Sequence, residues 1–146
     1  MKLFSKKSVY GLRAVLYIAS LENQQQYVST LQLSNDLKIS FHFLTKILQS
    51  LSQNNIVSSH RGRNGGVSLT KQAKKITLIE IISVLEGPEF FNGCILCLPD
   101  CDNEMPCPLH NYWAEIRDDL KSIFENTNIE ELGEKIRNDG LRLMPV

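Results

Sequence analysis

The chain has 146 residues, of which 42% are apolar and 22% are charged. This composition is typical of a globular protein with its own hydrophobic core, and it excludes a collagen-like or low-complexity chain. No apolar run approaches the roughly 18 residues that a membrane span requires. The first residues also lack the pattern of a signal peptide, so we expect a cytoplasmic protein.

The net charge of zero conceals two oppositely charged halves. Residues 1–75 carry eleven Lys and Arg residues against two acidic residues, a balance of +9. Residues 76–146 carry five basic residues against fourteen acidic ones, a balance of −9. A strongly basic half favours a polyanionic partner, either nucleic acid or a membrane surface, over a charge asymmetry that arose by chance.

Three helices are predicted in the basic half. An apolar-rich stretch over 9–21 predicts a helix that is buried on most of its surface. A capping-box pattern at Ser29 opens a short helix that ends at Leu37. After a three-residue connection, Ser40 caps a helix over 41–53 whose apolar residues recur on one face. Two short helices joined by so tight a turn are typical of a helix-turn-helix.

Two short strand-like runs follow, over 56–60 and 67–69. They flank a turn with three glycines and two arginines, and this pattern predicts a β-hairpin. A hairpin directly after a helix-turn-helix is the wing of a winged helix. We therefore predict a mostly α-helical fold with a small β-hairpin wing.

The acidic half begins with another predicted helix. Thr77 and Glu80 have the spacing of a capping box, and Gly87-Pro88 predicts the end of this helix. The following segment, 89–107, has neither a helical nor a strand period, although it holds all four cysteines. A loop of this length needs a stabilising reason, and a bound metal would supply one.

A long helix is predicted after this loop, with apolar residues at spacings of 4, 3, 4 and 3 on one face. This seam consists of Leu109, Trp113, Ile116, Leu120 and Ile123. A two-heptad seam suits packing against a partner helix, so we favour a homodimer over packing within the chain. Thr127 and Glu130 predict a last capping box.

The second helix of a helix-turn-helix enters the major groove, where its first residues meet the base edges. On the helix over 41–53, His42 and Thr45 can hydrogen-bond bases, and Phe41 can contact a thymine methyl group. Lys46 is better placed for a phosphate. The alternative is that these residues form a solvated helix face.

Three residues at the predicted wing tip, Arg61, Arg63 and Asn64, are further candidates for DNA contact. Arginines on a slender glycine-rich tip fit the narrow minor groove, whose negative potential attracts them. The alternative is an exposed loop that is charged only for solubility.

The cysteines follow the pattern Cys94-x-x-Cys97-x-x-x-Cys101-x-x-x-x-x-Cys107, and His110 comes three residues later. Thiolates and an imidazole this close in sequence can surround one metal centre, and soft sulfur ligands select zinc or an iron–sulfur cluster. A thiol–disulfide switch and inert buried cysteines are the alternatives. The chain has no phosphate-binding loop, nucleophile elbow or zinc-protease motif, so we do not expect an enzyme.

Together these features resemble the Rrf2 family of bacterial winged-helix regulators, whose sensor members include the IscR and NsrR types. The resemblance covers about residues 1–140. Its motifs are matched by 6–14 at the opening, 39–48 in the recognition segment, 61–66 in the wing and 107–113 at the exit of the sensor loop.

The resemblance implies a dimer that binds a pseudo-palindromic operator in double-stranded DNA, with an affinity that follows the state of an iron–sulfur cluster. It places three cluster ligands at Cys94, Cys101 and Cys107. His110 and Cys97 are rival candidates for the fourth ligand, because Val9 stands where some members supply a carboxylate. A 2Fe–2S cluster is favoured and a 4Fe–4S cluster is possible. The family also has members without a cluster.

We therefore predict a winged helix-turn-helix DNA-binding domain in residues 1–75, followed in 76–146 by a cysteine-loop sensor and dimerisation region. The predicted function is a cluster-gated transcriptional regulator. The alternatives are a DNA-binding regulator with structural zinc or metal-free cysteines, and a winged helix that binds a protein partner.

Overall fold

The computed structural model describes residues 2–144, and this part of the chain is mostly helical with one two-stranded antiparallel hairpin. The helices and strands are α1 (Lys6–Ala19), α2 (Thr30–Leu37), α3 (Phe41–Gln53), β1 (Val57–His60), β2 (Gly66–Leu69), α4 (Leu78–Glu86), α5 (His110–Asn126) and α6 (Ile129–Asn138), with 3-10 turns η1 (Ala73–Lys75) and η2 (Pro88–Asn92). The predicted fold class is thus confirmed. Among the described residues, no helix is long and apolar enough to cross a membrane.

Helices α2 and α3 form the predicted helix-turn-helix. Lys38 ends α2 in the left-handed conformation, with φ 51°, and α3 begins three residues later. The side chain of Ser29 accepts the backbone N–H of Gln32, which is half of the predicted capping box. The Gln32 amide instead donates to the Tyr17 hydroxyl on α1, so a tertiary contact replaces the other half. One apolar face of α3 is buried, as its periodicity predicted.

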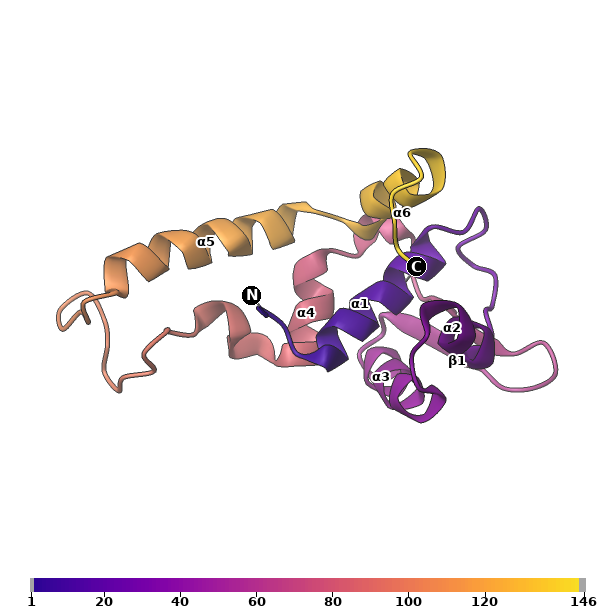
Figure 1. Cartoon of the computed structure of the whole chain (residues 1–146), viewed down its shortest axis with the longest axis horizontal. Coiled ribbons are helices and arrows are strands. Elements are labelled where there is room, and N and C mark those ends of the chain that lie inside the picture. The colour runs from indigo at the N-terminus through magenta and orange to yellow at the C-terminus, as the bar shows by residue number, and fades with distance from the viewer. Residues whose placement is uncertain (1, 145–146) are drawn as a thin grey trace.

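The hairpin is joined to the body through its second strand. Val67 exchanges two backbone hydrogen bonds with Val28, which precedes α2. Gly66 makes this approach possible, since its φ is 150° and an added Cβ would lie 2.1 Å from the Val28 carbonyl oxygen. The exposed wing loop, residues 61–65, projects from one end of the molecule (Figure 1).

The core lies between α1, α2, α3, α4 and the hairpin, and it extends to the last helix. Ile81 of α4 and Ile129 of α6 are both fully buried in it. Gly133 lets α6 lie close against Ala19 near the end of α1. The core therefore takes residues from both sides of residue 75, and the functional division at that point stays a prediction.

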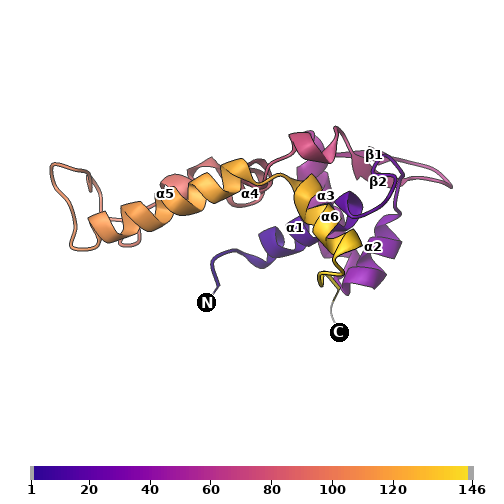
Figure 2. The ribbon, with the colours of Figure 1, turned by 90° about the horizontal axis from the view of Figure 1, so that it is seen from above.

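Helix α5 extends away from this core, and no residue along it is buried (Figures 1 and 2). In the predicted seam, Ile116 and Ile123 are each 58% exposed and Leu109 is 40% exposed. Trp113 and Leu120 are half-buried, on the side that faces η2 and the N-terminal segment. Much of the seam is thus left uncovered within one protomer.

Two predicted helix starts need correction. Helix α1 begins at Lys6 because Ser5 caps it, with the Glu86 carboxylate accepting the Ser5 backbone N–H at 2.7 Å. The cap of α6 is Asn128, and the capping box predicted at Thr127 is wrong by one residue. The Thr127 carbonyl accepts the backbone N–H of Leu78, so this residue flanks the antiparallel bridge between Thr77 and Asn128.

Candidate DNA-binding groove and cysteine cluster

Helix α3 and the wing form two walls of one open groove of about 630 Å³. Phe41 and Thr45 line it from α3, and Arg61 lines it from the wing. The start of α2, at Ser29–Leu31, closes its end. The groove thus combines a helix face, a hairpin and a helix N-terminus, which are the parts that a winged helix presents to a duplex.

The exposed side chains around this groove are basic or neutral. Phe41, Thr45 and Arg61 line the groove, and Phe41 is 44% exposed. His42, Lys46 and Arg63 do not line it, although they are exposed on the same helix and wing loop. Asn64, the third predicted wing residue, is also exposed. None of the described residues that line the groove is acidic. Its chemistry therefore suits a polyanion.

Two hydrogen-bonding side chains of the groove are already oriented by the fold. The Thr45 hydroxyl donates to the Phe41 carbonyl at 2.8 Å, which leaves its oxygen to accept from a base. His60 packs against Tyr27, with ring centroids 5.3 Å apart and the rings tilted by 42°, and lines the groove from β1. The sequence prediction missed His60. His60 directly follows Ser59, which also lines the groove, so strand alternation does not predict its position and only the tertiary structure reveals it.

At the far end of the molecule, three of the four cysteines converge. The Sγ atoms of Cys94, Cys101 and Cys107 all lie within 4.8 Å of one another. Cys107 is buried, while Cys94 and Cys101 are half-buried. Three soft sulfur donors in so small a space could hold a metal or an iron–sulfur cluster.

Two thiols of this triad, those of Cys94 and Cys101, have pKa values shifted in opposite directions. The backbone N–H of Leu96 is the main cause that lowers the pKa of Cys94, because it stabilises the thiolate. For Cys101, a backbone hydrogen bond from Cys107 acts to lower the pKa, but desolvation and the neighbouring cysteines raise it overall. Negative charge on one thiolate thus opposes a second, and a bound cation would relieve that repulsion.

The two candidates for the fourth ligand are placed differently. Cys97 is exposed, and its thiol donates to the Cys94 carbonyl at 3.1 Å, so it engages the loop backbone. His110 lies in the first turn of α5, with Nδ1 3.4 Å from the Sγ of Cys101. The structure thus brings an imidazole to the edge of the thiol triad. Which residues ligate stays a prediction.

Both ends of the cysteine loop are attached to the beginning of α5. The indole N–H of Trp113 donates to the Gly93 carbonyl at 2.8 Å, directly before Cys94. The backbone N–H of His110 donates to the Cys107 carbonyl at 2.9 Å. A movement of either end of the loop would therefore act on the first turns of α5.

Comparisons with known proteins agree with this architecture. Residues 4–135 match a family model described as Rrf2, iron-dependent transcriptional regulator. A putative HTH-type transcriptional regulator from Aquifex aeolicus is 31% identical over 132 residues, covering 89% of this chain and 90% of the relative. The regulator IscR from Photorhabdus laumondii is 30% identical over 128 residues, covering 88% and 77%.

Solved structures give the same result. The structure of CymR, the global cysteine regulator of B. subtilis, matches with a TM-score of 0.78 and 28% identity, covering 92% of this chain and 98% of that one. The T. potens IscR structure, at 20% identity, shows the same fold with a TM-score of 0.76 over 97% of this chain and 93% of that one. The chain therefore belongs to the Rrf2 family of transcriptional regulators, which are DNA-binding proteins and not enzymes.

Proposed function

We propose that this protein is a dimeric regulator whose affinity for a pseudo-palindromic operator is set by an iron–sulfur cluster on the cysteine loop. The observation that carries the proposal is the convergence of three cysteine sulfurs within 4.8 Å at the start of α5. The proposed ligands are Cys94, Cys101, Cys107 and His110.

The donor set supports a cluster. Three thiolates and one imidazole suit a 2Fe–2S cluster, and an all-cysteine set that includes Cys97 would suit a 4Fe–4S cluster. Zinc is the alternative, since it accepts the same donors. When bound, a cluster supplies a cross-link that oxidants, nitric oxide or iron limitation can remove. The protein's part is to hold Cys107 in a buried position and Cys94 beside the Trp113 anchor.

The groove between α3 and the wing is the proposed DNA surface. Phe41, His42 and Thr45 would face base edges in the major groove, and Lys46 would contact a phosphate. The wing residues Arg61, Arg63 and Asn64 would lie along the minor groove. This proposal is supported by a groove that Phe41, Thr45 and Arg61 line and that no described acidic residue lines. The remaining candidates are exposed on the same helix and wing loop.

Dimerisation would use the uncovered seam of α5. An apolar helix face with two isoleucines that are each 58% exposed is costly in water, and a partner helix would bury it. Residues 76–146 would then act as the sensor and dimerisation region, and residues 1–75 as the DNA-binding domain. In such a dimer, the angle between the two α5 helices sets the distance between the two α3 helices.

The mechanical connection between the cysteine loop and the winged-helix body would run through packed helices. Helix α5 packs on η2 and α4, and α4 packs on α3. Aromatic rings of Phe4, Phe90, Phe91 and Phe124 fill the space between α5 and the body, with centroids 5.0–5.7 Å apart. A coupling free energy of roughly 1–3 kcal/mol would change operator affinity by about 5- to 150-fold.

The test begins with protein purified without oxygen, whose absorption spectrum and iron, sulfide and zinc contents are measured. Operator fragments are then selected from genomic DNA, and their affinity is compared for the wild type, Cys107→Ala and the matched control Cys97→Ala. We expect a brown wild type, a colourless Cys107→Ala with altered affinity, and a Cys97→Ala variant like the wild type.

Other outcomes contradict specific parts of the proposal. A colourless protein with one zinc per chain would assign the cysteines a structural role. Identical operator affinity of wild type and Cys107→Ala under all redox conditions would refute gating. Loss of the cluster in Cys97→Ala but not in His110→Ala would assign the fourth position to the cysteine.

A further inference from the structure

His110 is held between two partners on opposite sides of its ring. Its Nδ1 lies 3.4 Å from the Sγ of Cys101, and its Nε2 lies 3.1 Å from the side-chain Oδ1 of Asn103. An amide oxygen can only accept a hydrogen bond, so with this oxygen facing the ring the hydrogen bond forms when Nε2 carries the proton. In a neutral imidazole the lone pair is then on Nδ1, the nitrogen that faces the thiols.

The position of Asn103 is itself determined by the loop. The carboxylate of Asp102 accepts the backbone N–H groups of Glu104 and Met105, each at 2.8 Å, and closes a tight turn around Asn103. On the other side, His110 is held by the hydrogen bond of its backbone to Cys107. The two side chains are seven residues apart in sequence, but each is presented by its own local turn.

We propose that Asn103 is a positioning residue, which fixes His110 in the Nε2–H tautomer so that Nδ1 is the nitrogen offered to the metal centre. This inference rests on the proposed function, because it concerns the fourth ligand of the cluster site. Histidines that bind metals usually donate their second ring N–H to an oxygen acceptor, which orients the ring and raises its basicity. Loss of such a partner typically lowers metal affinity by about 10- to 100-fold.

The tautomer can be measured without a metal. In reduced, metal-free protein with 15N-labelled histidine, long-range 1H–15N couplings report which ring nitrogen carries the proton of neutral His110. We expect Nε2–H in the wild type, a mixture of both tautomers in Asn103→Ala, and Nε2–H again in Asn103→Asp, whose carboxylate also accepts. The matched control is Asn111→Ala, since Asn111 is an exposed asparagine next to His110. A purely structural role of Asn103 would not move the tautomer.

The second readout uses protein reconstituted with iron and sulfide. We expect the cluster of Asn103→Ala to be lost to a chelator about 10- to 100-fold faster than that of the wild type or Asn103→Asp. Pulsed EPR of the reduced cluster should show coupling to a histidine nitrogen. Absence of that coupling in a brown wild type would overturn the assignment of Nδ1 as a ligand.

Failure of this inference can be told apart from failure of the proposed function. A brown wild type whose Asn103→Ala variant keeps the tautomer and the cluster lifetime overturns the role of Asn103 alone. A wild type with Nδ1–H does the same. A wild type that binds no cluster after reconstitution overturns both proposals, whatever its tautomer.

Discussion

Replacing one wing arginine with alanine is expected to weaken DNA binding and to reduce the dependence of the affinity on salt concentration. Arg63 is exposed at the wing tip and makes no salt bridge with any residue that the structure describes, so its charge is available to DNA. Each phosphate neutralised by Lys or Arg contributes about 0.9 to the slope of log affinity against log salt concentration. A dimer with two wings would lose two such contacts in Arg63→Ala, so the slope should fall by about 1.8.

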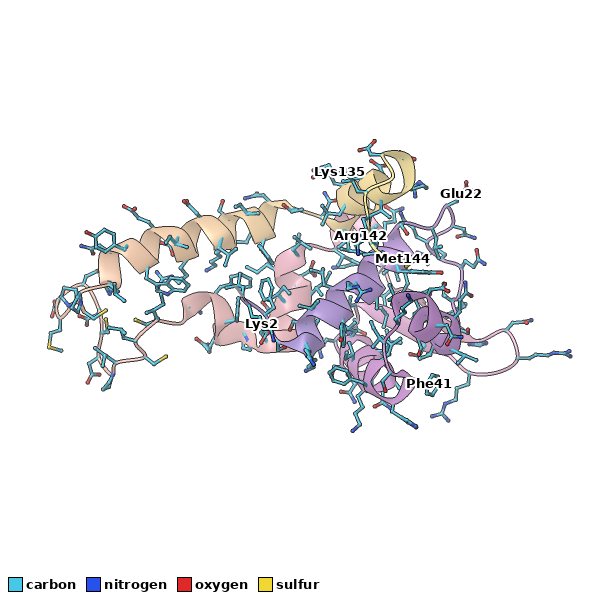
Figure 3. The ribbon with its side chains drawn as sticks, in the orientation of Figure 1. Lys2, Glu22, Phe41, Lys135, Arg142 and Met144 are labelled. Carbon is cyan, nitrogen blue, oxygen red and sulfur yellow. The ribbon has the colours of Figure 1, made fainter. Side chains whose placement is uncertain are left out.

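This slope difference has a measurable consequence. Between about 50 and about 200 mM salt, the wild type should lose about 12-fold more affinity than Arg63→Ala. Fluorescence anisotropy with a labelled operator fragment over a salt series measures this directly. The matched control is Lys135→Ala, because Lys135 pairs with Glu131 at 2.7 Å on α6, on the opposite side of the body from Phe41 (Figure 3). An unchanged slope in Arg63→Ala, or an equal change in Lys135→Ala, would refute the assignment of the wing.

Three further predictions concern the body and the sensor end. In Gly133→Ala, the new Cβ would lie 2.5 Å from the Ala19 carbonyl oxygen. Overpacking against backbone costs about 1–3 kcal/mol and better helix propensity offsets at most about 1 kcal/mol, so urea unfolding should show a net loss of stability; equal or higher stability would contradict this contact. For Glu80, burial acts to raise the pKa, but the ion pair with Lys71 and the capping hydrogen bonds lower it below 4.5 overall. Its contribution to stability is therefore present above pH 4.5 and lost as the pH falls through the lowered value, so the wild type should exceed Glu80→Gln in stability at neutral pH and match it in acid; a constant difference would exclude this linkage. Trp113 is the one tryptophan of the chain and is attached beside Cys94, so its fluorescence should be quenched by cluster loading and recover on chelation, whereas zinc loading should leave it bright.

The parts of the fold that were predictable are those decided by neighbouring residues. The Thr77–Glu80 capping box is present, and α4 stops before Gly87-Pro88 as predicted. The predictions are wrong where contacts with distant segments determine the start of a helix. Asn128, which caps α6, itself forms an antiparallel bridge with Thr77, about 50 residues away, and no local pattern contains that contact.

The cysteine site also combines features that neighbouring residues determine with features that depend on the tertiary structure. Spacing alone showed that thiols gather in one loop, but it could not show which of them converge. Cys97 adopts a left-handed conformation, with φ 47°, and its thiol is used by the loop backbone. The partnership of Asn103 with His110 depends on an irregular loop, which has no period that a sequence pattern could reveal.

The arrangement of the molecule restricts how a signal at the cysteines could affect DNA. The cysteine loop and the wing lie at opposite ends of the molecule, so the loop does not touch the groove of its own protomer (Figure 1). Among the residues that the structure describes, the α5 helix meets the body mainly through η2, α4 and the aromatic rings near Phe124. A change in the loop would therefore act on α5 as a rigid element and tilt it against α4, with the groove itself unchanged. On this reasoning, loss of the cluster should alter affinity for the two-half-site operator much more than affinity for a single half-site, and equal effects on both would place the switch inside the winged helix instead.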